Sequence, residues 1–264
     1  MVGDVQDRYA GDLGDFLKLG LLRWLVPPGD AAHRLGVIWY LTLDEAHNAD
    51  GKHVAYLAPA SRAGRKLRQL DADLYDRLAE MVQSGQRSTA ALANAGVLGP
   101  TTSFFNEVLD LSALPIAVRD ARRAQRAAWL QRALEATAEC GFVFADPDNG
   151  IRSVSHAAGS HRNKAEKHAY LDELARFAER GQSLVVYHHA DRSAPVPEQA
   201  RRRLEDLARE VPITPIAAVR ASRGTTRLFL IGAASAPHEA YLRDRLEELG
   251  QSAWSSELTV YWSN

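Results

Sequence analysis

Short apolar runs alternate along this chain with stretches in which apolar residues recur every three or four positions. The runs are rich in aromatic and β-branched residues and have the length of a typical strand; they lie at 37–41, 142–145, 184–187, 228–231 and 258–262. The stretches between them have the period of an amphipathic helix. This order predicts an α/β protein in which helices cover both faces of a mostly parallel sheet.

The helical stretches also carry end signals. Asp12 is placed to cap an N-terminal helix that stops before Pro27, and Gly181 is placed as the C-terminal cap of a helix over 165–180. We expect further helices at 67–81, 197–207 and 238–249. Residues 85–118 are the least regular part of the chain, and a strand with an irregular loop is expected there.

The composition changes this picture little. The 264 residues are 46% hydrophobic and 25% charged, as in globular proteins, and no stretch looks like a linker, so one domain is expected over residues 1–264. The formal net charge of -1 gives no overall field that favours nucleic acid or an anionic membrane. Cys140 is the single cysteine, which excludes an intrachain disulfide. No apolar window has the length of a signal-peptide core or a bilayer span, and we expect a cytoplasmic protein without a membrane partner.

The predicted architecture is one doubly wound, Rossmann-like sheet with an N-terminal helix and a C-terminal strand, helix and strand. In such sheets, ligands bind in the crevice outside the carboxyl ends of the strands. Three of the predicted strands run into unusually polar sequence at that end, at 44–53, 146–150 and 187–192. Because parallel strands place these ends on one edge, we expect a shared functional site around Asp146 and the residues that follow it.

The residue types at this edge support two kinds of chemistry. In one, Asp146 and Asn149 form hydrogen bonds that fix an acceptor amine or hydroxyl while a bound cofactor donates a methyl group. In the other, carboxylates and imidazoles coordinate a divalent metal that activates water, with ligands from Asp44, His47, Asp146, Asp148 and His188. No pair of these residues has a diagnostic spacing such as H-E-x-x-H, so the residues alone leave both interpretations open.

The N-terminal segment resembles a known family. Residues 9–18 (YAGDLGDFLK) resemble the opening of the large-subunit ribosomal RNA adenine-N6 methyltransferases, which have an Ala-Gly pair, an Asp and a Lys at matching spacing. That family also has an Asp-Pro-Pro-Tyr motif after its fourth strand, and the equivalent place here is occupied by Asp146-Pro147-Asp148-Asn149. The family's second proline and aromatic are thus Asp148 and Asn149, and its glycine-rich turn after the first strand has no counterpart in 44–51.

The resemblance implies a class I methyltransferase fold with S-adenosylmethionine as the cofactor. It implies that Asp146 holds the acceptor group. It also implies that Lys18, together with Tyr9, belongs to an N-terminal element that closes over the cofactor.

Our leading hypothesis is a methyltransferase-like enzyme that acts on nucleic acid or on a small polar acceptor. The expected catalytic residues are Asp146, Asp148, Asn149 and His188. The imidazole of His188 is the expected general base, because imidazole titrates near neutral pH. Besides Tyr9 and Lys18, the expected cofactor contacts are Asp44, Glu45 and His47. The alternatives are a metal-dependent hydrolase or nuclease that uses the same acids and histidines, and a non-catalytic module that binds a nucleotide or nucleic acid.

Overall fold

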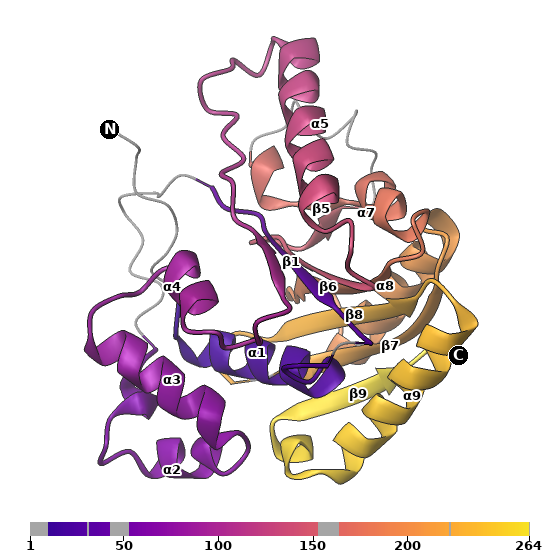
Figure 1. Cartoon of the computed structure of the whole chain (residues 1–264). Helices are drawn as coiled ribbons and strands as arrows, with labels where there is room; N and C mark the ends of the chain where they lie inside the picture. The colour runs from indigo at the N-terminus through magenta and orange to yellow at the C-terminus, as the bar shows by residue number, and fades with distance from the viewer. Residues whose placement is uncertain (1–9, 31, 43–52, 153–163, 222, 264) are drawn as a thin grey trace.

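The computed structural model describes residues 10–30, 32–42, 53–152, 164–221 and 223–263. A seven-stranded sheet in the order β2-β1-β3-β6-β8-β7-β9 forms its centre (Figure 1). The strands are β1 (Leu35–Trp39), β2 (Ser103–Phe105), β3 (Phe142–Asp146), β6 (Ser183–His189), β7 (Thr214–Ala221), β8 (Arg227–Ala233) and β9 (Leu258–Trp262). Strands β2, β1, β3 and β6 are parallel, whereas β8 is antiparallel to both of its neighbours and β9 is antiparallel to β7. This mostly parallel sheet, flanked by helices, confirms the predicted α/β, Rossmann-like fold.

Helices cover both faces of the sheet. Helices α1 (Leu13–Leu25) and α9 (Ala236–Gln251) pack on one face, and α5 (Arg119–Ala136), α7 (Leu171–Ala178) and α8 (Val196–Glu210) pack on the other (Figure 1). Side chains alternate along each strand, so that Val185 belongs to the α1 side of the core and Val186 to the α5 side. Because both faces are covered, the strands are apolar runs without alternating polarity.

A group of three helices packs against the side of α1 that faces away from the sheet (Figure 1). They are α2 (Arg62–Arg68), α3 (Ala72–Gln83) and α4 (Thr89–Asn94). Helix α1 is therefore buried on nearly all sides, and its residues Phe16, Leu17, Leu19, Leu21 and Leu22 are each at most 1% exposed. The shorter elements are η2 (Ala55–Leu57), β4 (Ile151–Arg152), η3 (Ala165–Lys167), β5 (Ala169–Tyr170) and η4 (Ala253–Ser256).

Some element boundaries differ from those that the sequence predicts. The helix predicted over 67–81 is two helices, because Asp71 starts α3 by accepting a hydrogen bond from the Leu74 amide at 2.9 Å. The helix predicted over 165–180 begins only at Leu171, because η3 and β5 occupy the residues before it. The irregular region 85–118 contains the expected strand, β2, together with α4. No helix in the described part of the chain is both long enough and apolar enough to cross a membrane.

Candidate functional site

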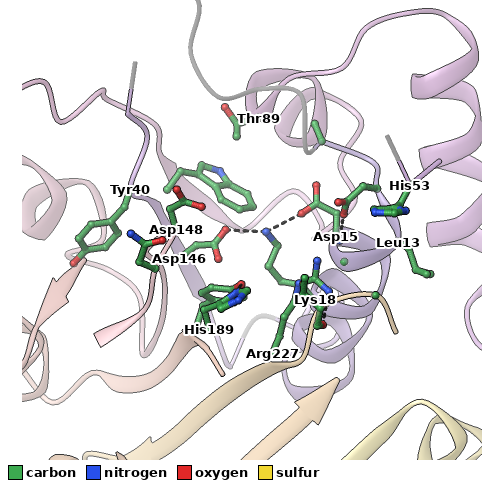
Figure 2. Close-up of a pocket in the computed structure, with 18 of the residues that line it drawn as sticks. Leu13, Asp15, Lys18, Tyr40, His53, Thr89, Asp146, Asp148, His189 and Arg227 are labelled. Carbon is green, nitrogen blue, oxygen red and sulfur yellow. Dashed lines mark hydrogen bonds and ion pairs between the residues drawn. The ribbon is translucent and has the colours of Figure 1, made fainter. Parts of the chain in front are cut away.

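A pocket of about 560 Å³ lies at the carboxyl ends of β1, β3 and β6, next to the first turn of α1 (Figure 2). Strands β2 and β3 flank β1 on opposite sides, so the order of strands reverses at this place. Such a reversal is the position where open α/β sheets bind ligands. The pocket therefore lies where the topology of the sheet predicts a site.

Lys18 lies at the centre of the pocket and joins two carboxylates (Figure 2). Its Nζ is 2.7 Å from Asp15 Oδ1 on the same helix and 2.7 Å from Asp146 Oδ2 at the end of β3. It also lies 4.7 Å from the centre of the Trp39 ring, which favours a cation. Burial lowers the pKa of Lys18, but the charges of Asp146 and Asp15 outweigh burial and raise it. Lys18 is thus a permanent cation at physiological pH.

The first turn of α1 is fixed by hydrogen bonds that begin before the helix. Asp12 caps α1 by accepting from the Asp15 amide at 2.9 Å, and Asp15 Oδ2 in turn accepts from the Gly11 amide at 3.0 Å. Gly11 has a φ of +81°, and its carbonyl accepts from the hydroxyl of Tyr56 at 3.1 Å. Burial, together with the charge of Asp15, raises the pKa of Asp12. These contacts hold Lys18 and Asp15 in position at the pocket.

The turn after β3 brings the predicted Asp-Pro-Asp-Asn segment to the pocket wall. Asp146, Asp148 and Asn149 all line the pocket. Burial raises the pKa of Asp146, and the charge and hydrogen bond of Lys18 oppose that rise. Asp148 forms an ion pair with Lys167 at 3.1 Å, and the backbone N–H of Asn149 donates to the backbone carbonyl of Lys167 at 2.9 Å. The turn is therefore tied to the segment that contains Lys167.

That segment is itself held by a buried arginine of α5. Arg126 is 0% exposed and donates to the carbonyls of Ala165 at 2.9 Å and His168 at 2.6 Å. Its charge is balanced by Glu173 on α7, whose Oε2 is 2.8 Å from Nη2 of Arg126. Arg126 thus fixes the backbone on both sides of Lys167, and through Lys167 it supports the position of Asp148.

The structure places the two adjacent histidines of β6 on opposite faces of the sheet. His188 follows Leu184 and Val186 onto the α5 face, is 6% exposed and accepts a hydrogen bond from the Ile151 amide at 3.1 Å. Burial, followed by the charge of Arg203, lowers its pKa to about 3. The predicted role of His188 as general base does not fit this position, because the side chain is outside the pocket and holds a proton only weakly.

His189 is the histidine of β6 that lines the pocket, together with Tyr187. The hydroxyl of Tyr187 lies 3.3 Å from Nδ1 of His189. Burial raises the pKa of Tyr187 to about 12, so the hydroxyl keeps its proton at neutral pH. This pair supplies polar groups to the pocket from β6, the strand next to β3.

The remaining predicted residues fall outside the part of the chain that the structure describes. They are Tyr9, Asp44, Glu45 and His47, so their contacts with a cofactor stay predictions. Asp44 and His47 also belong to the metal set, and that set is described only in part. Within the described residues, no group of three or more His, Cys, Asp or Glu side chains is arranged to hold a metal. Moreover, the ammonium of Lys18 already lies between Asp15 and Asp146, where it supplies the positive charge that a metal would bring.

Several residues of the pocket were not among the predicted site residues. Asp15 had a usable signal, because it precedes Lys18 by three positions and therefore lies on the same face of α1. Trp39 belongs to an apolar run with no polar neighbour to mark it. Arg227 begins β8, a strand whose direction is not encoded in its apolar pattern. Trp39 and Arg227 reach the pocket through the topology of the sheet and not through any motif.

Comparison with protein-family models finds no family that matches this chain, and comparison with curated proteins finds no match either. Folds of this class support many unrelated activities, so the architecture alone does not indicate a reaction. We therefore infer function from the chemistry of the pocket.

Proposed function

We propose that this chain is a methyltransferase-like enzyme that uses S-adenosylmethionine and acts on nucleic acid or on a small polar acceptor. One observation carries the proposal: Lys18 Nζ and Asp146 Oδ2 lie 2.7 Å apart although they are separated by 128 positions in the sequence. The two segments that resemble the adenine-N6 methyltransferases therefore meet in one pocket. An accidental likeness of two short segments would give no reason for that meeting.

The residues of the pocket fit a methyl donor of this kind in size and in charge. A volume of about 560 Å³ lies in the usual range for small-molecule sites, about 300–1,000 Å³. Carboxylates of Asp146 and Asp148 suit ammonium and hydroxyl groups, the guanidinium of Arg227 suits a carboxylate, and Trp39 offers an aromatic surface. Strand β1 runs into Trp39, Tyr40 and Leu41 and not into glycines, so a ligand meets side chains at this end of the pocket.

When bound, S-adenosylmethionine supplies a methyl group on a positively charged sulfur. The chain's own residues orient the acceptor. Asp146 accepts a hydrogen bond from the acceptor's N–H or O–H, and Lys18 favours the charged form of Asp146 and fixes its rotamer. His189, on the neighbouring strand β6, is the imidazole of the pocket that can take up a proton released by the acceptor.

Ligand-dependent stability tests the proposal most directly. S-adenosylhomocysteine at 100 times its dissociation constant should stabilise the protein by about 2.7 kcal/mol, and EDTA should leave that effect unchanged. The variant Asp146→Asn should keep this stabilisation but lose transfer of a labelled methyl group to total RNA and to a low-molecular-weight cell extract. Asp244→Asn, an exposed residue of α9, serves as the matched control and should keep both properties.

The same stability measurements, with metals and RNA as further ligands, distinguish the alternatives. Stabilisation by Mn²⁺ or Zn²⁺ that EDTA abolishes, without any response to the methyl donor or its product, would overturn the proposal in favour of a metal-dependent hydrolase. Salt-sensitive binding of RNA that survives Asp146→Asn, again without a response to the methyl donor, would favour a binding module.

A further inference from the structure

Two backbone carbonyls hold the side chain of Arg227 at the wall of the pocket. Arg227 is the first residue of β8, and its Nη1 donates to the carbonyls of Arg223 at 3.2 Å and Thr225 at 3.0 Å. Figure 2 shows its guanidinium beside Lys18. Because two backbone carbonyls occupy Nη1, the position of the guanidinium is set before any ligand binds.

The first turn of α1 is built to leave room for this guanidinium. A Cβ atom at Gly14 would lie 2.5 Å from Nη2 of Arg227 and 2.6 Å from its Cζ. No side chain larger than glycine is compatible with this contact unless Arg227 moves. The guanidinium thus lies flat against α1, at the end of the helix where backbone amides favour negative charge.

Among the residues that the structure describes, Arg227 has no carboxylate partner, in contrast to three other cations of the pocket. Lys18 pairs with Asp15 and Asp146, Lys167 pairs with Asp148, and Arg223 pairs with the buried Glu257. Among the residues that the structure describes, no carboxylate lies within 4 Å of Arg227, and its Nε and Nη2 have no acceptor. The charge of Arg227 acts to lower the pKa of Asp12, but the Asp12 carboxylate caps α1.

A second donor in the same pocket also lacks an acceptor. Trp39 is 3% exposed, and its indole Nε1 has no hydrogen-bond partner among the described residues of the chain. A buried donor without a partner is unfavourable, so such groups are rare in native proteins and commonly mark a missing ligand or water. A ligand rich in acceptor oxygens would therefore satisfy the donors of both Arg227 and Trp39.

We infer that the ligand of this pocket carries an oxyanion, a carboxylate or a phosphate, and that Arg227 is its anchor. The inference deepens the proposed function and rests on it for the choice of probes. Two sources can supply the oxyanion: the amino-acid tail of the methyl donor, or a phosphate or carboxylate of the acceptor. Arg is suited to both, because its planar fork donates two parallel hydrogen bonds to either group.

Calorimetric titrations with matched pairs of probes test this inference. S-adenosylhomocysteine is compared with 5′-methylthioadenosine, which lacks the carboxylate, and adenosine monophosphate is compared with adenosine. Inorganic phosphate is titrated alone. In at least one pair, the wild-type protein should bind the probe with the oxyanion more tightly than the probe without it. Arg227→Met should weaken the affinity for the probe with the oxyanion about ten- to a hundredfold and leave the affinity for the other probe unchanged.

Gly14→Ala provides a variant that does not depend on removing the charge. The added Cβ displaces the guanidinium, which is the far end of a long side chain, and alanine is a better helix former than glycine, so the variant should fold but bind the oxyanion more weakly. In the double variant Gly14→Ala, Arg227→Met, the two losses of affinity for the oxyanion should not add, because both substitutions act on one contact. Arg132→Met, an exposed arginine of α5 that pairs with Glu107, is the control and should bind every probe as the wild type does.

Each outcome decides between the possibilities. Dependence on Arg227 only in the first pair assigns the oxyanion to the methyl donor, and dependence only in the second pair assigns it to the acceptor. Binding of adenosine monophosphate or phosphate through Arg227, with no binding of S-adenosylhomocysteine, keeps the inference and overturns the methyltransferase proposal. Equal binding of all probes by wild type and Arg227→Met, or no binding of any probe with an oxyanion, overturns the inference.

Discussion

Replacing Lys18 with methionine tests the ion network at the centre of the pocket. The side chain of Lys18 is 12% exposed, and those of Asp15 and Asp146 are 6% and 15% exposed, so little water reaches the group. The variant leaves two carboxylates close together without their cation. Breaking a buried pair by removing one partner costs about 3–5 kcal/mol. A loss of this size is a large part of the total stability of a typical domain, about 5–15 kcal/mol.

The loss should depend on pH in a defined direction. Without Lys18, the pKa of Asp146 rises further above its ordinary value of 3.8, because burial and the charge of Asp15 remain. A carboxyl group whose pKa is raised in the folded state destabilises the fold as the pH rises through that pKa. Lys18→Met should therefore be least stable, relative to the wild type, near pH 7 and above, and the difference should shrink as the pH falls toward 4.

Urea unfolding at pH 7.5 and pH 5 measures both effects. The midpoint at pH 7.5 should fall by about 1–2 M, with little change in the slope. Asp146→Asn alone should cost less, because Lys18 keeps Asp15 as a partner. The double variant Lys18→Met, Asp146→Asn should recover at least about 1 kcal/mol relative to Lys18→Met, since it removes one unpaired charge. A cost below about 1 kcal/mol for Lys18→Met at pH 7.5, or a double variant less stable than Lys18→Met, would refute this reasoning.

Two further predictions concern the turn after β3 and the buried histidine behind it. Gly150 has a φ of +85° and a Cβ there would lie 2.4 Å from Nδ1 of His188, whereas Gly181 has a φ of +79° with nothing within 4 Å. Gly181→Ala should cost only the left-handed backbone, about 1–2 kcal/mol, and Gly150→Ala clearly more by urea unfolding; equal costs would contradict the geometry. The pKa of His188 is lowered by burial from 6.5 to about 3, so the unfolded chain binds a proton in this range that the folded chain does not. Stability should therefore fall with decreasing pH below 6.5, by up to about 1.4 kcal/mol per unit, and more steeply in wild type than in His188→Gln; parallel pH profiles would show that His188 does not carry the effect.

Strands β1, β3, β6 and β8 could be predicted because each is covered on both faces and is therefore a continuous apolar run. The same burial explains what the pattern misses. Strand β7 contains Ala217 and Ala218 in place of larger β-branched residues, and so its run carries a weak signal. The antiparallel direction of β8 is also absent from the pattern, because an apolar run has the same appearance in both directions. Direction follows from the packing of the whole sheet.

The site could be predicted in part for a similar reason. Asp146 lies at a strand end, and that place in an α/β sheet is where ligands bind. The choice between His188 and His189 could not be made, because β6 is apolar on both faces and shows no alternation that fixes the direction of a side chain. The partnership of Lys18 with Asp146 depends on docking α1 against β3, and Arg227 reaches the same pocket from β8. Contacts of this kind come from tertiary structure and not from local pattern.

The burial of α1 on nearly all sides has a consequence for synthesis. Lys18 leaves the ribosome 128 residues before Asp146, a delay of roughly 6–26 s at 5–20 residues per second. Helices and strands that cover α1, among them α9, come later still. For most of translation, the growing chain thus exposes an apolar side of α1 that chaperones can bind. A copy that stops before α9 leaves the side of α1 that packs on α9 uncovered, which gives quality control a means to recognise an incomplete chain.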